Sequence, residues 1–291
     1  MRIMNVDDRL ALLTPDGLRD VAELSHGAFG PDIQATYDRW AQFTAWARQY
    51  VIRGSREDLP GEGATIGSPS PRPRQVFAIG LNYRDHAEES RFGPPETPAV
   101  FTKFVTCLTG PCGELPLPSE YVDWEVELVV TVGRPATRVP ADDGWSYVAG
   151  LSVGQDYSER KVQLAGPAPQ FSLGKSFPCF GPIGPWLVTP DEFANPDDLE
   201  MECSVDGESV QKARTSSMIF GVAELIARLS AVTPLLPGDV IFTGTPSGVG
   251  GARTPPRFLR PGQVVVSRIA GIGTIRQVCV PSVAQPQNVI A

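Results

Sequence analysis

Acidic residues at alternate positions of the segment 123–132 are the first candidates for chemistry. Asp123, Glu125 and Glu127 precede a valine-rich run, which predicts a β-strand. Because strand side chains alternate between faces, Glu125 and Glu127 must point the same way, with Asp123 as a third candidate on that face. A solvated edge strand would explain two such glutamates. The apolar run that follows favours a central strand, where buried neighbouring carboxylates require a cation.

A further carboxylate, Asp156, follows an apolar segment at 147–153 and precedes Ser158-Glu159-Arg160, which suits the start of a helix. From spacing alone, Asp156 is explained equally well as a helix N-cap and as a metal ligand. Three carboxylates without a histidine cluster suit a hard cation, since Mg²⁺ prefers oxygen ligands and keeps positions open for substrate oxygens. A 2-oxo acid, which offers two oxygens in one chelate ring, would fit such a site.

One of the two histidines, His86, lies three residues before Glu89. A helical turn would place both on one face, where the carboxylate would orient the imidazole as a base that takes a proton from water. A surface histidine in a polar loop is the simpler explanation of this pair taken alone.

Two lysines and a glycine-rich segment complete the set of candidates. Lys103 and Lys175 are flanked by apolar residues. Each would stabilise an enolate from a partly buried cleft, or would cover the core with its stem and keep its charge in water. The segment 238–250 predicts a strand that enters a glycine-rich loop. It lacks the Gly-Lys-Ser/Thr of a phosphate loop, so its backbone N–H groups and the Thr245 hydroxyl suit a carboxylate better.

Composition narrows the class of protein. The chain has 291 residues and a net charge of −8. Because an acidic protein repels a phosphate backbone, we do not expect a nucleic-acid partner. No apolar run is long enough to span a membrane, and Asp7 and Asp8 stand where a signal peptide would be apolar. We therefore expect a cytoplasmic protein. The five cysteines contain no Cys-x-x-Cys pair, which argues against a disulfide framework and a thiolate zinc site.

Turn residues divide the chain into a small N-terminal domain plus linker, residues 1–72, and a larger domain, residues 73–291. The first is predicted to contain strands, a helix and a linker rich in Gly, Pro and Ser. The second is mainly β to about residue 281, with a helix at 217–230 that Ser217 would cap. The expected elements of the first domain are strands Arg2–Val6, Arg9–Thr14 and 18–22, a helix at 31–52 and the linker 53–74.

Together and in order, these segments resemble the fumarylacetoacetate hydrolase family, in the branch of acylpyruvases and 2-hydroxyhepta-2,4-diene-1,7-dioate isomerases. The resemblance covers about residues 75–280. It implies an α+β, mainly β fold, a mixed β-sandwich roll with a small N-terminal α/β domain, and a homodimer. The matching segments are 80–89, Lys103, 125–128, 156–163, 174–177, 184–188, 237–241 and 244–250.

The resemblance also implies roles for individual residues around an Mg²⁺ ion, with Mn²⁺ or Ca²⁺ as alternatives. A lid at 84–96 would carry the water-activating pair and would order when substrate binds. Lys161 and the tryptophan-free stretch 165–172 depart from the family pattern, which bears on substrate identity and not on the metal site. The implied metal ligands are Glu125, Glu127 and Asp156; the catalytic residues are His86, Glu89 and Lys175; the substrate contacts are Lys103, Arg160, Gln163 and Thr245.

These residues predict a metal-dependent hydrolase that cleaves a carbon–carbon bond in a small 1,3-diketo acid, such as an acylpyruvate or a fumarylacetoacetate-like compound. Two alternatives remain open. The same metal–enolate site would support oxaloacetate decarboxylation, or isomerisation or hydration of a 2-hydroxydienoate. The chain would otherwise be a catalytically inactive metal-binding member of the family.

Overall fold

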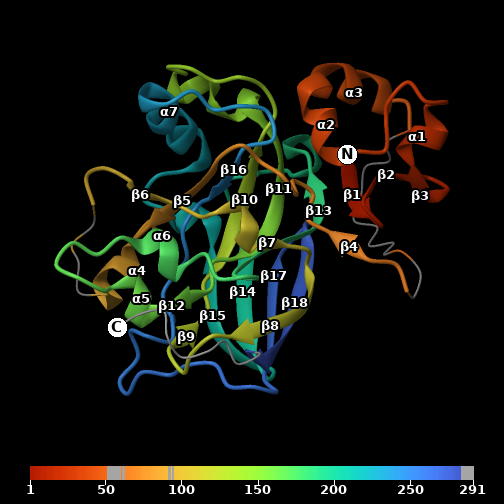
Figure 1. Cartoon of the computed structure of the whole chain (residues 1–291). Helices are drawn as coiled ribbons and strands as arrows, with labels where there is room; N and C mark the ends of the chain where they lie inside the picture. Colours follow the sequence, from red (N-terminus) through yellow and green to blue (C-terminus); the bar gives the residue numbers. More distant parts are fainter. Residues whose placement is uncertain (51–59, 61–62, 91–92, 94, 283–291) are drawn as a thin grey trace.

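The computed structural model describes residues 1–50, 60, 63–90, 93 and 95–282, and a large β-sheet runs through most of them (Figure 1). This sheet has 11 strands and is mainly antiparallel. Two strands lie off its main path: β4 (Ile66–Gly67) pairs with β1, and β7 (Leu108–Thr109) pairs with β13. The order of the others is β3 (Gly17–Asp20), β2 (Arg9–Thr14), β1 (Arg2–Val6), β13 (Gly181–Val188), β11 (Val148–Gln155), β10 (Val126–Val132), β16 (Val240–Phe242), β5 (Val76–Gly80) and β6 (Ala99–Thr102).

A second sheet of five strands packs against the first. Buried apolar side chains from both sheets, such as Val126 and Leu128 on one side and Met201 and Ile275 on the other, belong to one core cluster. This packing confirms the predicted β-sandwich. The order in the second sheet is β15 (Glu208–Arg214), β14 (Glu200–Val205), β17 (Val264–Ile269), β18 (Gly273–Pro281) and β8 (Cys112–Leu117), and β9 (Val122–Asp123) pairs separately with β12 (Ser158–Glu159).

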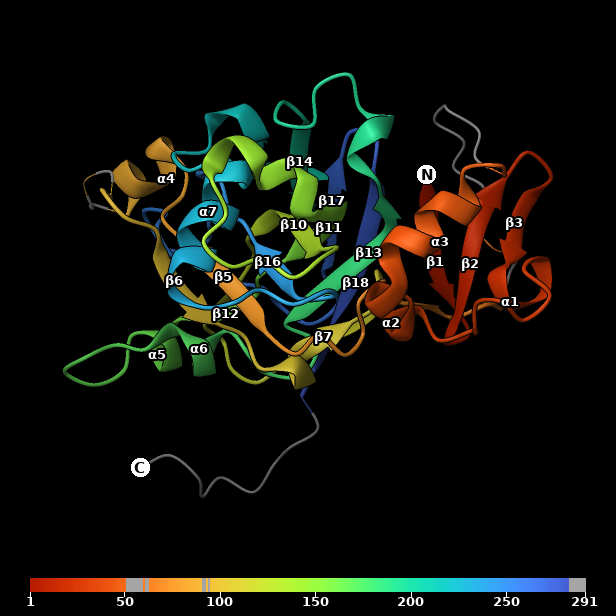
Figure 2. The same cartoon turned by 90° about the horizontal axis from the view of Figure 1, so that it is seen from above.

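The helices are short and lie at the periphery. In Figure 2 the N-terminal unit stands at one end of the molecule and the helices that surround the candidate site stand at the other. Among the described residues, no helix has the length and apolarity that a bilayer span requires. The α-helices are α1 (Val21–Leu24), α2 (Ile33–Thr36), α3 (Trp40–Ala47), α4 (Arg84–Glu89), α5 (Arg160–Gln163), α6 (Phe171–Gly174) and α7 (Val222–Val232). The 3₁₀ turns are η1 (Tyr37–Arg39), η2 (Val105–Cys107), η3 (Ala141–Tyr147), η4 (Pro190–Glu192) and η5 (Thr215–Ser217).

The N-terminal residues form a hairpin unit whose apolar cluster includes Ile3, Leu12 and Phe43, together with Ala149 and Leu187 of the large sheet. Its first strand also extends the large sheet, because Arg2 and Ile3 pair with Val188 and Leu187 of β13. The unit is therefore continuous with the sheet that carries the candidate site.

Two predicted helices differ from the observed ones. The helix expected at 31–52 begins at Ile33, is interrupted where Arg39 leaves helical geometry (φ −123°, ψ 25°) and ends at Ala47; residues 51 and 52 lie outside the described residues. The helix expected at 217–230 begins at Val222 and is not capped by Ser217. The reason is that the Asn82 side chain holds both backbone polar groups of Phe220 and keeps that segment extended.

Strand boundaries differ in smaller ways. The strand expected at 18–22 ends at Asp20, whose carboxylate caps α1. The strand expected at 147–153 runs from Val148 to Gln155. The linker at 53–74 is only partly described, since residues 53–59, 61 and 62 lie outside the described residues. Its later part is fixed in place, because β4 pairs with β1 and Ser70 is buried.

Candidate active site

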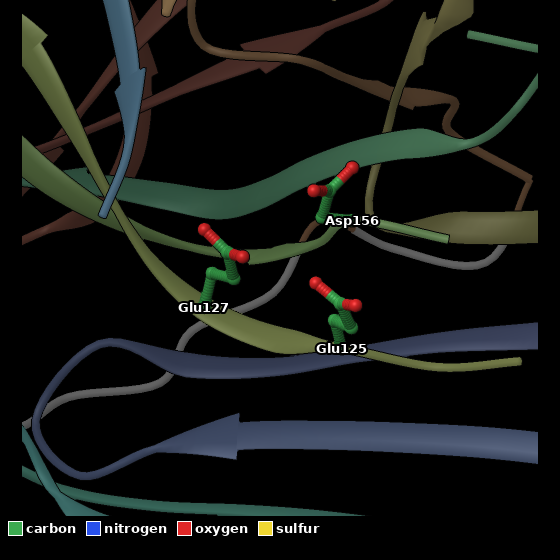
Figure 3. Close-up of side chains that lie close together, drawn as sticks. All are labelled: Glu125, Glu127 and Asp156. Atoms are coloured by element: carbon green, nitrogen blue, oxygen red, sulfur yellow. The ribbon is translucent and has the colours of Figure 1, made fainter. Parts of the chain in front are cut away.

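Three carboxylates lie close together where β10 begins and β11 ends (Figure 3). Glu127 lies in β10, Glu125 immediately precedes that strand, and Asp156 immediately follows β11. One ligand oxygen of each lies within 4.8 Å of the others. All three residues are buried, with exposed fractions of 4%, 1% and 0% for Glu125, Glu127 and Asp156. The alternation that predicted a shared face for the two glutamates is confirmed, and β10 is a central strand.

Cationic side chains surround this carboxylate cluster. Lys175 Nζ lies 2.7 Å from Glu125 Oε2 and 2.8 Å from Asp156 Oδ2. Lys103 Nζ lies 2.6 Å from Asp156 Oδ1 and also donates to the carbonyl oxygens of Lys175 and Phe180. Both lysines are buried, which excludes the alternative in which each keeps its charge in water. Both Asp156 carboxylate oxygens accept hydrogen bonds from these lysines, and the N-cap of α5 is Glu159.

The protonation properties of the glutamates differ because their neighbours differ. Burial opposes ionisation of Glu125, yet Lys175 and Arg160 outweigh it and lower its pKa to about 2. Burial raises the pKa of Glu127, and repulsion from Asp156 and Glu125 adds to the increase. Burial also opposes the charge of Lys175, but Asp156 and Glu125 raise its pKa above the ordinary value. Glu127 is thus the carboxylate with the least compensated charge.

The donor set fits a divalent cation. Its three residues offer only carboxylate oxygens, which are the ligands that Mg²⁺ and Mn²⁺ prefer, and no cysteine or histidine belongs to the set. Burial makes Glu127 costly to ionise without added positive charge. These observations make Glu125, Glu127 and Asp156 the residues that would hold the ion.

Asp123 does not belong to this cluster. It lies in β9, which is separated from β10 at Trp124 and Glu125, and it is not among the carboxylates whose oxygens lie within 4.8 Å of one another. Its Oδ1 lies 2.7 Å from Arg160 Nε, and its Oδ2 accepts a hydrogen bond from the Gly251 N–H. Arg160 Nη2 donates to Glu125 Oε1 at 2.7 Å. Asp123 therefore orients the arginine that contacts one of the candidate ligands.

His86 and Glu89 lie on one face of α4, as their spacing predicts. His86 Nδ1 and Glu89 Oε2 are 3.3 Å apart, and His86 is buried, which excludes the surface-loop explanation. Both Glu89 oxygens lie 3.0 Å from the Gly248 N–H. Gly248 has φ +105°, and a Cβ there would stand 2.1 Å from the Val210 carbonyl oxygen, so this position requires glycine.

The glycine-rich loop after β16 also contacts the carboxylate cluster. The Gly244 N–H donates to Glu127 Oε2 at 2.8 Å. The Thr245 hydroxyl donates to the Val126 carbonyl oxygen. The loop thus does supply N–H groups to carboxylates, as its composition suggested, but those carboxylates belong to the protein.

A pocket of about 640 Å³ lies above the cluster. Its wall includes apolar side chains from loops, the short helix α6 and strand β6, among them Phe101, Leu164, Phe171, Val249 and Phe258. Glu127, Asp156 and Lys103 lie beneath its surface and do not line it. The site residues expected from the sequence that do line it are His86, Glu89, Glu125, Arg160, Gln163, Lys175 and Thr245.

Two glutamines beneath the cluster were not identified from the sequence. Gln155 is 0% exposed and Gln211 is 2% exposed, and each accepts a hydrogen bond from the backbone near Glu125. A signal was present for Gln155, which ends a strand of mainly apolar and small residues, because a buried amide there must find partners. Gln211 lies beside Lys212 and gave no such signal. The partners themselves were not visible because they come from distant segments.

Comparisons with known proteins agree with the geometry. The family model described as fumarylacetoacetate (FAA) hydrolase C-terminal matches residues 75–280. Human "Oxaloacetate tautomerase FAHD2A, mitochondrial" is 43% identical over 253 residues, which cover 85% of this chain and 81% of that protein. A solved Mycobacterium smegmatis structure assigned as HpcE has 54% identity, a TM-score of 0.91 and coverage of 97% of this chain and 99% of that one. Maleylpyruvate hydrolase from Sphingobium sp. SYK-6, solved with manganese(II) and pyruvate, has 26% identity, a TM-score of 0.78 and coverage of 97% and 100%.

Proposed function

Because this chain belongs to the fumarylacetoacetate hydrolase family, we propose that it is a divalent-metal-dependent enzyme that forms and protonates the enolate of a small 2-oxo acid. Tautomerisation of oxaloacetate is the first reaction to test, since a relative with 43% identity is named for it. The observation that carries the proposal is the cluster of three buried carboxylates, which meets Lys175 at the floor of a pocket that His86 also lines.

A divalent cation held by Glu125, Glu127 and Asp156 would supply Lewis-acid polarisation of an oxo group and charge to balance an enolate. Mg²⁺ is the ion we expect, and Mn²⁺ is the alternative because the solved maleylpyruvate hydrolase contains manganese. Lys175 presents a cation at the same floor, where it stabilises negative charge on the 2-oxo oxygen.

His86 performs the proton transfer. When Nδ1 donates to Glu89, Nε2 is left as the acceptor that takes a proton from C3 of the acid. The protonated Nε2 then gives a proton to the 2-oxo oxygen, so His86 returns to its neutral form and the keto and enol forms interconvert without a change in mass. The apolar wall of the pocket limits access of water to the enolate.

Hydrolytic carbon–carbon cleavage is the second candidate, and the buried His86–Glu89 pair favours it. The same Nε2 would take a proton from water, which would attack the distal carbonyl of a 1,3-diketo acid. The bond between C3 and that carbonyl would break and leave the pyruvate enolate at Lys175. Both candidates therefore share the enolate and differ in the group that His86 deprotonates.

The test measures purified protein with Mg²⁺ or Mn²⁺ on oxaloacetate and on a panel of acylpyruvates. Absorbance follows the enol, and mass spectrometry identifies products. Faster enol–keto exchange without a new mass supports tautomerisation, two shorter acids indicate hydrolysis, and CO₂ indicates decarboxylation. Turnover no faster than that of the metal alone on every acid would overturn the proposal and leave an inactive metal-binding member of the family.

The two histidines give a matched pair of variants. His86→Asn is expected to lower turnover by roughly 10²- to 10⁴-fold, the usual contribution of a general base. His26→Asn is the control, because His26 is exposed in the N-terminal unit and asparagine tolerates its positive φ of 51°. Equal turnover of both variants would remove His86 from the mechanism.

A further inference from the structure

The backbone between the two glutamates lacks a strand neighbour on one side. On that side β10 pairs with β16, and the pairing runs from Thr131 opposite Val240 to Val129 opposite Phe242. Beyond it, Thr243 still donates to the Leu128 carbonyl oxygen. At Val126 the ladder has ended, yet Val126 is 0% exposed, so its N–H and C=O need other partners.

Side chains supply those partners. Gln211, from β15 of the second sheet, accepts a hydrogen bond from the Val126 N–H at 3.0 Å through Oε1. Its Nε2 donates to the Thr245 hydroxyl and to the Pro246 carbonyl oxygen, both at 2.8 Å. Thr245 in turn donates to the Val126 carbonyl oxygen at 2.9 Å. The network closes on itself, so both backbone groups of Val126 and the amide of Gln211 are satisfied.

The preceding peptide is held in a similar way from the other side. Gln155 Oε1 accepts from the Glu125 N–H at 2.8 Å. Its Nε2 donates to Ser267 Oγ at 2.8 Å in the second sheet. Two buried glutamines thus fix consecutive N–H groups at the point where the chain passes from Glu125 to Glu127.

We propose that Gln211 is a positioning residue that sets the separation of the Glu125 and Glu127 carboxylates for metal binding. The carboxylates belong to residues i and i+2, so their relative placement depends on the backbone of Val126 staying extended. Gln211 and Thr245 replace the missing strand there and hold that conformation. This inference rests on the metal site of the proposed function.

The experiment compares Mn²⁺ binding to the full chain and to two variants by calorimetry, well below the unfolding temperature. Gln211→Met keeps the volume and removes every hydrogen bond of the amide. Asn5→Leu is the matched control, because Asn5 is a 1% exposed amide that donates to Ser68 in the N-terminal unit. We expect Gln211→Met to weaken Mn²⁺ binding by about 10- to 100-fold, the usual effect of losing a residue that orients metal ligands. The electron paramagnetic resonance spectrum of bound Mn²⁺ should change as well.

Each outcome decides the question. If both variants lose stability and both bind Mn²⁺ like the wild type, Gln211 is only a packing residue and the inference is wrong. If the wild type itself binds no Mn²⁺, the proposed function fails and the inference fails with it. Should Gln211→Met not fold, Thr245→Val cuts the same network with a smaller change. Its Mn²⁺ affinity is expected to fall, and wild-type affinity would overturn the inference.

Discussion

Replacing Glu127 by glutamine should make the metal-free protein more stable and the metal-loaded protein less so. Glu127 is 1% exposed, and burial, Asp156 and Glu125 all raise its pKa. The substitution removes this poorly compensated charge while an amide oxygen still accepts from the Gly244 N–H. The same substitution removes one of three oxygen ligands, so the two effects have opposite signs.

The sign and size of the first effect follow from linkage. A carboxyl whose pKa is higher in the folded than in the unfolded protein destabilises the fold as pH rises above the ordinary value of 4.5. Removing this buried, poorly compensated charge should therefore stabilise the metal-free protein by about 1–2 kcal/mol at neutral pH, within the range seen when buried charges are replaced by neutral side chains. For a chain of this length, that gain raises the unfolding temperature by about 2–3 °C. The pH dependence above 4.5 should also become flatter in Glu127→Gln.

The second effect appears when Mn²⁺ is added. An ion at about 100 times its dissociation constant stabilises the wild type by about 2.7 kcal/mol. Glu127→Gln should lose most of this increment. Glu200→Gln is the control, since Glu200 is exposed and its ion pair with Lys212 is 3.7 Å long, so neither melting temperature should change. A variant that melts below the wild type without metal and keeps the Mn²⁺ increment would refute the reasoning.

Three further predictions concern other parts of the site and the thiols. Lys103→Met leaves a buried carboxylate short of a partner and should cost about 3–5 kcal/mol of unfolding free energy in urea titrations; a loss below 1 kcal/mol, on the order of an exposed ion pair, would contradict the buried charge. Gly248→Ala, with its Cβ 2.1 Å from the Val210 oxygen, should destabilise by about 1–3 kcal/mol and lower turnover further than stability explains. Alkylation of the native protein should modify exposed Cys112 first and spare Cys203, whose pKa burial raises to about 12, as intact-mass and peptide analysis would show; early labelling of Cys203 would count against that burial.

Turn residues and the periodicity of strands and helices predicted much of the site. Strands β1 and β2 have the predicted bounds, because a polar turn separates two short apolar runs. The period of two predicted that Glu125 and Glu127 share a face, and the period of the helix predicted that His86 contacts Glu89. Each inference depends on residues no more than a few positions apart, which is the range over which backbone geometry alone decides.

Long-range contacts account for what the sequence did not reveal. The strand expected at 123–132 is divided at Trp124 and Glu125, and Asp123 contacts Arg160 and lies outside the carboxylate cluster. At the division, Gln155 and Gln211 accept hydrogen bonds from the Glu125 and Val126 N–H groups. Gln211 lies 85 positions from Val126, and no local pattern links them. The same holds for the helix at 222, which begins late because of a contact with Asn82.

The floor of the site and its wall have different origins, and this difference bears on how one fold supports several reactions. The floor consists of buried ion pairs. Lys103 pairs with Asp156, and Lys175 and Arg160 pair with Glu125. A substitution there disturbs buried partners and costs stability. The wall comes mainly from loops and short helices, and some of its side chains, such as Leu164 at 58% exposure, lie largely in solvent. Changes of substrate should therefore arise in the wall, while the chemistry of the enolate stays with the floor.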